Sequence, residues 1–432
     1  MLKSCFKNIL VEFFMEKVYL LGGLRSHIGL TGGIFKKIPA EDLAAAVMKN
    51  LMEKYPCAGK AQGIFCGNAV GTGGNITRLA ALKAGFPTSI PALTIDMQCA
   101  SAAAAVELAM AKIGSGMADI LIAGGFESTS MQPVRNYAKE DPRYTPEGFT
   151  VAQFSPDTVS ARAMLEGAER TCQKHGFTRE ELDAFAVRSH QLAKKAREEN
   201  RLKDIVVSVF DSNADEGIRD RMSPKLASRM PKLFKEKEVK ALLETVTDFP
   251  LLQKSLLLKE KEQGSGLPSE NKTTVTPLLT AANACLMNDG AAFVVLVSER
   301  ALKKFGLQPE AELLNGCQWG VDPRYSPEGA IETGDRLLER SGLQPEQIDI
   351  FEYNEAFAVI SALFARKYPK LAERYCPWGG ALAYGHPYGA SGAILLLHLW
   401  QELKQMHGRL GLVSIAGAGG LGTALLVRNL QK

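Results

Sequence analysis

The chain has 432 residues, of which 46% are hydrophobic and 23% charged, and its 51 Lys and Arg against 47 Asp and Glu give a net charge of +4. This composition is typical of a soluble globular protein of two or three domains and excludes a disordered or fibrous chain. The balanced charge argues against binding nucleic acid through a basic face, and no apolar stretch approaches the ~20 residues that cross a bilayer. We therefore predict neither a nucleic-acid partner nor a membrane partner.

The N-terminus and the cysteines add two further expectations. Residues 1–16 contain a short apolar run, but Glu12 interrupts it and no small-residue cleavage site follows. We therefore predict an N-terminal extension and not a signal peptide. The eight cysteines form no CxxC pair, and the six histidines lack metal-type spacing. We expect no metal site and no disulfide framework, so a reduced, cytoplasmic chain is the prediction.

Short apolar strands alternate with helical patterns along the first part of the chain. Strands are predicted over 18–21, 63–66, 93–96 and 120–123, and helices over 42–54, 75–84 and 100–113. The alternation resumes after residue 291, with strands predicted over 293–297, 348–353, 410–415 and 423–427 and helices over 331–341, 356–367 and 391–406. This pattern indicates βαβ units and an α/β fold whose sheet is covered on both faces.

The middle of the chain, about 130–272, differs because it is more polar and mostly helical, with a helix predicted over 179–199. Its charged segment 235–272 contains the apolar run FPLLQKSLLL. That run fits a lid or an oligomer contact, and it equally fits a solvated surface excursion. The two flanking parts also resemble each other faintly. The first part has the sequence CAS, then a predicted apolar helix, then IAGG. The second part has GAS, then a predicted apolar helix, then IAGAGG. Two copies of one α/β layer would explain the similarity, and so would chance.

Cys99 is the first candidate for chemistry. A predicted strand ends at Asp96, a short turn follows, and Cys99 then stands at the start of an Ala-rich helix. Unpaired backbone N–H groups and the positive end of the helix dipole stabilise a thiolate at such a place, which favours a nucleophile at neutral pH. The alternative is that Cys99 is a small buried hydrophobic residue.

Three further segments carry candidate residues. His386 lies in a loop rich in Gly and Pro, which holds an imidazole rigidly and lets a ligand approach the backbone. Asn354 begins the sequence NEAF, where its amide fits either a water-holding or oxyanion-binding role or a helix cap. The glycine loop at 416–422 suggests a phosphate-binding nest only weakly, because no helix follows it at once.

Together these segments resemble the thiolase family over nearly the whole chain from about Lys17. The matching segments, in order, are the one around Cys99, GGFESTS at 124–130, AANACLMNDGAA at 281–292, NEAF at 354–357, GGALAYGHPYGASGA at 379–393, and the last glycine loop. The resemblance implies an α/β thiolase fold, with two similar halves in a layered αβαβα body and an inserted loop domain. We place the N-terminal half at 17–129 and 273–298, the inserted loop domain at 130–272, and the C-terminal half at 299–432.

The resemblance also implies the chemistry. Thiolases transfer acyl groups between coenzyme A thioesters in two steps, so acyl-CoA and CoA are the expected partners and no bound cofactor is expected. Cys99 would attack the thioester carbonyl and His386 would accept its proton. Asn354 would hold a water that forms one oxyanion hole with His386, and the backbone N–H groups of Cys99 and Ala418 would form the other.

Two more residues match the coenzyme A site of the family. Arg219 falls where a basic residue approaches the nucleotide phosphates. Cys285 falls where the family usually has a serine near the pantetheine arm, although it fits a plain core position equally well. Because thiolases are usually dimeric or tetrameric, we expect a homodimer or homotetramer.

One departure from the family pattern concerns Ala416. The last motif of the family normally begins with a second cysteine, which moves the proton on the α-carbon of the second acyl-CoA, and here Ala416 occupies that place. A methyl group cannot transfer a proton, so Cys285 or Cys376 would have to substitute. The alternatives are a thiolase-fold acyltransferase that passes the acyl group to another acceptor, or a subunit that binds coenzyme A esters without turnover.

Overall fold

The computed structural model of the chain describes residues 16–156, 160–244 and 275–431. Most of the predicted extension 1–16 and the run FPLLQKSLLL lie outside these residues. The described strands are β1 (Val18–Ser26), β2 (Gly29–Leu30), β3 (Ile64–Gly67), β4 (Ala92–Ile95), β5 (Ile120–Glu127), β6 (Val206–Val207), β7 (Asn288–Ser298), β8 (Ala311–Gly320), β9 (Ile350–Tyr353), β10 (Leu410–Gly417) and β11 (Leu421–Asn429).

The described α-helices are α1 (Ala40–Lys54), α2 (Ile76–Lys83), α3 (Ser101–Gly114), α4 (Ala163–Lys174), α5 (Arg179–Glu198), α6 (Pro224–Ala227), α7 (Glu236–Glu244), α9 (Glu299–Phe305), α10 (Glu328–Ser341), α11 (Ala358–Lys367), α12 (Ala381–Tyr384) and α13 (Ser391–Gln405). Among the described residues, no helix combines the length and the apolarity that a membrane crossing requires.

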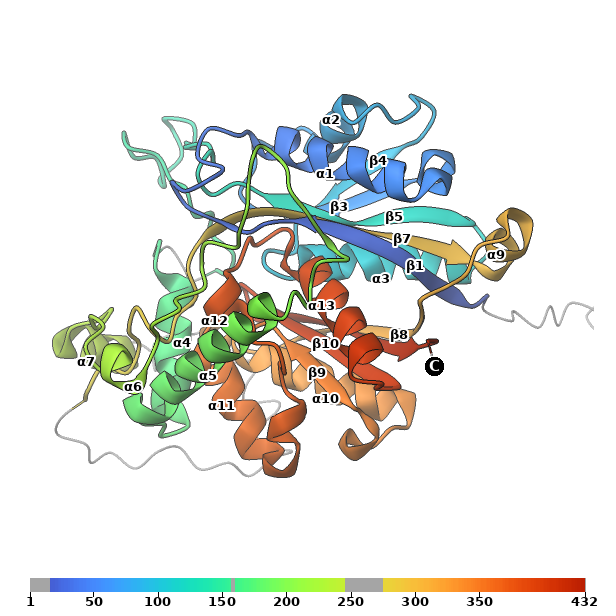
Figure 1. Cartoon of the computed structure of the whole chain (residues 1–432). Coiled ribbons are helices and arrows are strands. Elements are labelled where there is room, and N and C mark those ends of the chain that lie inside the picture. Colours follow the sequence, from blue (N-terminus) through green and yellow to red (C-terminus); the bar gives the residue numbers. More distant parts are fainter. Residues whose placement is uncertain (1–15, 157–159, 245–274, 432) are drawn as a thin grey trace, which may run out of the picture.

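The elements stack in five layers (Figure 1). α1 and α2 cover the outer face of the first half, whose strands follow the order β4-β3-β5-β7-β1. The second half continues as β8-β11-β10-β9, with α10 and α11 on its outer face. α3 and α13 lie between the two halves and contact strands of both. The expected αβαβα arrangement with an inserted loop domain is therefore confirmed.

The two halves repeat one pattern around the central helices. α3 precedes β5 and α13 precedes β10, and each helix packs on the strand that follows it. The faint similarity between the two sequences therefore reflects two copies of one α/β layer. The halves join through a short antiparallel pairing of β1 with β8, over Val18 to Leu20.

Three apolar cores separate the layers. The central core packs α3 and α13 between the two halves and includes Cys99. The second core lies beneath α10 and α11, and the third beneath α1 and α2. α3 has six alanines among its 14 residues, and small side chains allow the close approach that a helix buried on both sides requires.

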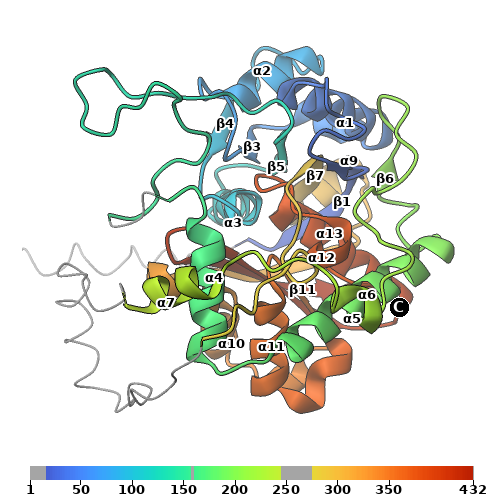
Figure 2. The same ribbon diagram turned by 90° about the vertical axis from the view of Figure 1, so that its left-hand side faces the viewer.

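Between β5 and β7 the described chain leaves the main sheet, except where β6 pairs with β1. α4, α5 and α6 lie beside the second half, and the segment between β5 and α4 extends away from the body at the upper left of Figure 2. α5 begins with a capping box, in which Thr178 accepts a hydrogen bond from the backbone of Glu181 and the Glu181 side chain bonds back to Thr178.

Candidate active site

Cys99 lies on a tight turn between β4 and α3. Gln98, just before it, adopts a left-handed backbone with φ of 53°, which is uncommon for a residue other than glycine. Its N–H donates to the Asp96 carboxylate at 2.9 Å. The Ser101 hydroxyl accepts from the backbone N–H of Met97 at 2.8 Å and donates to the carbonyl of Gln98. These bonds hold the turn, so the position of Cys99 before the helix is rigidly defined.

Two segments from the distant C-terminal half press against this turn. A Cβ atom on Gly392, in the first turn of α13, would lie 2.3 Å from the backbone nitrogen of Ala103 in α3. A Cβ atom on Gly417, at the end of β10, would lie 3.0 Å from the carbonyl oxygen of Met97. Glycine at these two positions therefore brings the loop of His386 and the last glycine loop up to Cys99.

The Cys99 thiol is buried, with 8% of the residue exposed. Burial raises the pKa of Cys99 to about 12, although hydrogen bonds from the backbone of Cys99 and of Ala418 act to lower this pKa. The charge of Glu127 raises it further. The expectation of a resting thiolate is therefore wrong, because loss of hydration outweighs the helix terminus. The thiol needs a base to become a nucleophile.

The hydrogen bonds of His386 define its tautomer. Its Nδ1 lies 2.6 Å from the Ser391 hydroxyl, which donates its only proton to the carbonyl of Pro387 at 2.9 Å. We therefore assign the proton of the neutral ring to Nδ1, leaving a lone pair on Nε2. Burial lowers the pKa of His386 to about 3, so the ring is neutral at physiological pH and Nε2 can accept a proton.

Asn354 faces this imidazole, with its side-chain nitrogen 3.4 Å from Nε2 of His386. It follows the last residue of β9, and its backbone N–H donates to the carbonyl of Ser414 in β10 at 2.9 Å. The helix-cap alternative is wrong, because the N-cap residue of α11 is Phe357. The amide is therefore free of a capping role.

Cys285 lies close to the same site. Its backbone N–H donates to the carbonyl of Ala356 in the NEAF segment at 2.9 Å, and its half-buried thiol is an electrostatic neighbour of Cys99. Cys376 has different surroundings, since its buried thiol donates to the carbonyl of Tyr353 at 3.4 Å and is surrounded by the carboxyl groups of Glu352, Glu355 and Glu402. Of the two cysteines suggested as substitutes for the missing thiol, the structure thus brings Cys285 to Cys99.

Arg219 lies near the same segment. Its guanidinium donates to the carbonyl of Ala281 at 3.1 Å, four positions before Cys285, and its backbone N–H donates to Nδ1 of His190 at 3.1 Å.

The last glycine loop is a tight hairpin between β10 and β11. Gly419 and Gly420 at its tip have φ of 85° and 73°, which explains the glycines without a bound phosphate. Ala418 is buried beside Cys99, and Ala416 pairs with Gly422 inside the hairpin with 5% of its surface exposed.

Sequence reasoning missed Glu127, the last residue of β5, which organises the site from behind. Its buried carboxylate accepts hydrogen bonds from the Asn68 side chain at 2.9 Å, from the backbone of Ala69 at 2.8 Å and from the backbone of Gly389 at 3.0 Å. Burial raises the pKa of Glu127 to about 7. Its position in GGFESTS places a charged residue at the end of a buried strand, and that feature of the sequence could have marked Glu127 as a site residue. Glu127 thereby ties the His386 loop to the first half of the molecule.

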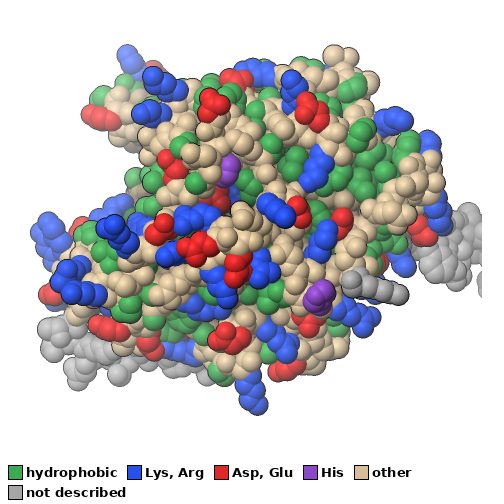
Figure 3. Space-filling model, in the orientation of Figure 1, with side chains coloured by type: hydrophobic (Ala, Val, Ile, Leu, Met, Phe, Trp, Pro, Cys, Tyr) green, Lys and Arg blue, Asp and Glu red, His purple; other side chains and the backbone are tan. Residues whose placement is uncertain are grey.

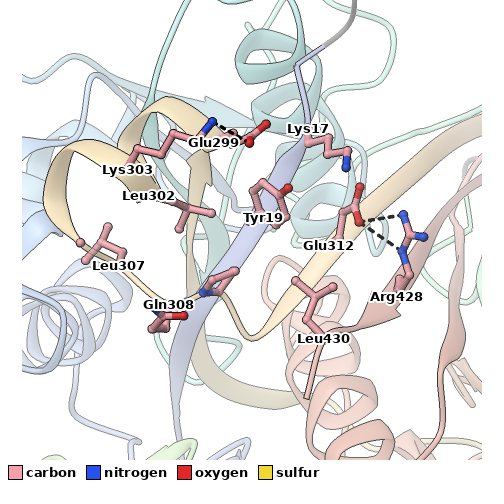
Figure 4. A pocket seen from close by; sticks show the side chains of 12 residues that line it. Lys17, Tyr19, Glu299, Leu302, Lys303, Leu307, Gln308, Glu312, Arg428 and Leu430 are labelled. Atoms are coloured by element: carbon pink, nitrogen blue, oxygen red, sulfur yellow. Dashed lines mark hydrogen bonds and ion pairs between the residues drawn. The ribbon is translucent and has the colours of Figure 1, made fainter. Parts of the chain in front are cut away.

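A separate pocket of about 610 Å³ lies where β1, β8 and β11 meet the helix α9 (Figure 4). Its acidic groups are already paired, Glu312 with Arg428 at 2.7 Å and Glu299 with Lys303 at 2.9 Å. None of the candidate residues lines it.

Comparison with known proteins identifies the family. The family profile described as "Thiolase, N-terminal domain" matches residues 18–237, and "Thiolase, C-terminal domain" matches residues 307–429. The chain belongs to the thiolase family. As a thiolase-family member it is an acyltransferase.

Individual relatives match along nearly their full length. The chain is 32% identical to an acetyl-CoA acetyltransferase of Allochromatium vinosum over 422 residues, which cover 96% of this chain and 100% of the relative. It is 31% identical over 403 residues to YhfS of Bacillus subtilis, named a putative acetyl-CoA C-acetyltransferase, covering 93% and 96%. The crystal structure of Bacillus anthracis acetyl-CoA acetyltransferase superposes with a TM-score of 0.81 at 26% identity, covering 96% and 99%. Human mitochondrial 3-ketoacyl-CoA thiolase shares the fold with a TM-score of 0.79 at 24% identity, covering 96% and 100%.

Proposed function

We propose that this thiolase transfers acyl groups between coenzyme A thioesters through an acyl-Cys99 intermediate, acting on acetyl-CoA or a short 3-ketoacyl-CoA. The observation that supports this most strongly is the combination of a buried thiol under the backbone N–H of Ala418 with a neutral imidazole whose Nε2 carries a lone pair. Relatives named acetyl-CoA acetyltransferase support the choice of substrate.

In the first step, Nε2 of His386 accepts the proton of Cys99 as the sulfur attacks the thioester carbonyl. The backbone N–H groups of Cys99 and Ala418 then stabilise the negative oxygen that forms next to the sulfur. With acetyl-CoA as donor, the bond from the acyl carbon to the CoA sulfur then breaks, and the leaving sulfur takes that proton from His386.

In the second step, CoA attacks acyl-Cys99 and the Cys99 sulfur leaves, while the oxygen on that acyl carbon stays under the backbone N–H groups of Cys99 and Ala418. A water held by Asn354, together with His386, forms the other proposed oxyanion hole. Because burial disfavours both charged forms, the thiol and the imidazole are neutral at rest, and the proton moves as the sulfur bonds to the thioester carbonyl.

Coenzyme A brings phosphate groups that need positive charge, and Arg219 is the proposed contact. Basic side chains continue from it over α6 and α7, where they gather on the left-hand part of the face in Figure 3. The exposed ones on and between these helices are Lys225, Arg229, Lys232, Lys235, Lys237 and Lys240. Such a group attracts an anionic ligand. Cys285, beside Cys99, is the proposed contact for the pantetheine arm.

We propose that two copies of the chain pair along β4. β4 ends the strand order of the sheet, and Leu93 in its middle is 43% exposed. Leu79 and Leu82 on the neighbouring α2 are also exposed. An exposed edge strand with apolar side chains is a surface that natural proteins cover, and a two-fold partner would cover it with the same surface.

A cytoplasmic location also stays a prediction, with the seven described cysteines all free thiols.

The test of this function is direct detection of the intermediate. After incubation with acetyl-CoA, we expect an added acetyl group on the Cys99 peptide by mass spectrometry, and acetoacetyl-CoA cleavage by CoA. Cys99→Ala should abolish both, while Cys57→Ala, at a partly exposed thiol in another part of the fold, should abolish neither. Acetylation without cleavage of acetoacetyl-CoA would favour transfer to another acceptor. No acetylation at all would contradict the proposal and favour a binding subunit.

A further inference from the structure

This inference rests on the proposed function. Cleavage of a 3-ketoacyl-CoA needs a proton carrier besides His386. When the bond between the α-carbon and the ketone carbon breaks, its electron pair stays on the α-carbon, which must be protonated. His386 already carries the proton of Cys99 at that stage. Ala416, in the hairpin beside Cys99, has only a methyl group to offer.

Tyr388 has a hydroxyl group beside His386 to which no role has yet been given. Its ring packs edge-on against the ring of His386, with centroids 5.1 Å apart and planes at 79°. It also packs against the central core that includes Cys99. Burial raises the pKa of the Tyr388 phenol, and the charges of Cys285 and Cys99 raise it further, so both sulfurs are its electrostatic neighbours.

The position of Tyr388 is defined on both sides. Before it, the carbonyl of Pro387 accepts from the Ser391 hydroxyl at 2.9 Å, and after it the N–H of Gly389 donates to Glu127 at 3.0 Å. The hydroxyl itself makes no hydrogen bond to any residue in the described part of the chain. A half-buried phenol held rigidly, with its hydroxyl unused by the protein, is available to a bound substrate.

Cys285 is the competing group, because it is an electrostatic neighbour of both Cys99 and Tyr388. Its side chain packs against the core that includes Ala416, whereas the ring of Tyr388 contacts the ring of His386 and packs against the core that includes Cys99. We propose that the Tyr388 hydroxyl is the proton carrier for the α-carbon, in the role for which this chain has no second cysteine.

The steps balance as follows. The Cys99 thiolate attacks the ketone carbon, the bond to the α-carbon breaks, and the Tyr388 O–H gives its proton to the α-carbon to release acetyl-CoA. The resulting phenolate takes the proton of the incoming CoA thiol, whose sulfur attacks acyl-Cys99 and releases the second acyl-CoA. The Cys99 thiolate takes its proton back from His386. The protein ends in its starting state, and the CoA proton replaces the one that Tyr388 delivered.

The test separates proton transfer from acylation. Tyr388→Phe removes only the hydroxyl, so we expect acetylation of Cys99 by acetyl-CoA to stay within about threefold of wild type. Cleavage of acetoacetyl-CoA, and exchange of the acetyl-CoA methyl protons for deuterium in D2O, should fall by about 10²–10⁴-fold. Tyr137→Phe, at a tyrosine stacked on Phe149 in the extended segment, is the matched control and should change neither reaction.

Two further variants keep the proposal open to refutation. Adding Ala416→Cys to Tyr388→Phe should restore cleavage by at least tenfold, which would exclude misfolding as the cause of the loss. Cys285→Ser tests whether the Cys285 thiol carries the proton instead, through the same cleavage and exchange measurements. The proposal is overturned if Tyr388→Phe retains cleavage and exchange, or if only Cys285→Ser loses them. If the wild-type protein shows no acetylation of Cys99 after incubation with acetyl-CoA, that result would instead contradict the proposed function itself.

Discussion

The hydroxyl of Ser391 determines which nitrogen of His386 can accept the proton of Cys99. It accepts from Nδ1 at 2.6 Å and is the only hydrogen-bond acceptor for that N–H among the described residues. Ser391→Ala removes it from a site in which His386 is 1% exposed. The Nδ1–H is then left unsatisfied, and the tautomer protonated on Nε2, which cannot accept a proton, becomes competitive.

The size of the effect follows from that lost bond. A buried donor without a partner costs about 1–3 kcal/mol, and ~1.4 kcal/mol corresponds to a tenfold change in rate. We therefore expect Ser391→Ala to slow the acetylation of Cys99 by about 10–100-fold, with an unchanged KM for acetyl-CoA, because Ser391 is buried and its hydroxyl is bonded to His386 and Pro387. Rapid-quench mass spectrometry of the Cys99 peptide during the first turnover measures this rate.

A matched variant separates this effect from simple destabilisation. Ser298 is a buried serine that also accepts one hydrogen bond, from Ala301 at 3.0 Å, and donates another, to Asp119 at 2.6 Å. Ser298→Ala should lower the thermal midpoint as much as Ser391→Ala does, but leave the acetylation rate within about twofold. Equal acetylation rates for Ser391→Ala and wild type would refute the assigned tautomer.

The remaining predictions concern stability and assembly. Burial raises the pKa of Glu402, beside the buried Glu352, to about 8 from 4.5. The folded protein therefore binds a proton that the unfolded chain releases between these pH values, so the unfolding free energy falls by ~1.4 kcal/mol per pH unit in this window. Glu402→Gln should flatten that fall, seen as a smaller loss of Tm between pH 5 and pH 8, and an unchanged slope would contradict the assignment. Leu93→Asp should shift the protein to a monomer in light scattering, whereas Leu430→Asp, at another exposed leucine, should not; a dimer in both variants would place the interface elsewhere.

Local sequence patterns were sufficient for most of the fold. The predicted helix at 100–113 is α3 (Ser101–Gly114) and the predicted helix at 391–406 is α13 (Ser391–Gln405), because apolar periodicity and flanking turns act within a few residues. β8 (Ala311–Gly320) was missed. Asn315 and Gly316 interrupt its apolar pattern, and its strand character comes from pairing with β11 along almost its whole length.

The sequence by itself also determined which residues to consider at the site. Cys99, His386 and Asn354 stand in segments of unusual composition and in the order of a known family, and that order survives without coordinates. The protonation state of Cys99 could not be read in this way. The helix start predicted a thiolate, whereas burial keeps the thiol protonated with a pKa of about 12.

Only the tertiary structure decided the protonation states and the proton path. The loss of hydration around Cys99 comes from segments up to about three hundred positions away, and the tautomer of His386 depends on a hydroxyl that accepts from it and donates to Pro387. The proximity of Tyr388 to both sulfurs depends on two halves of the chain packing against each other. Charge and hydration depend on everything within several ångströms of an atom, and neighbours in space are not neighbours along the chain.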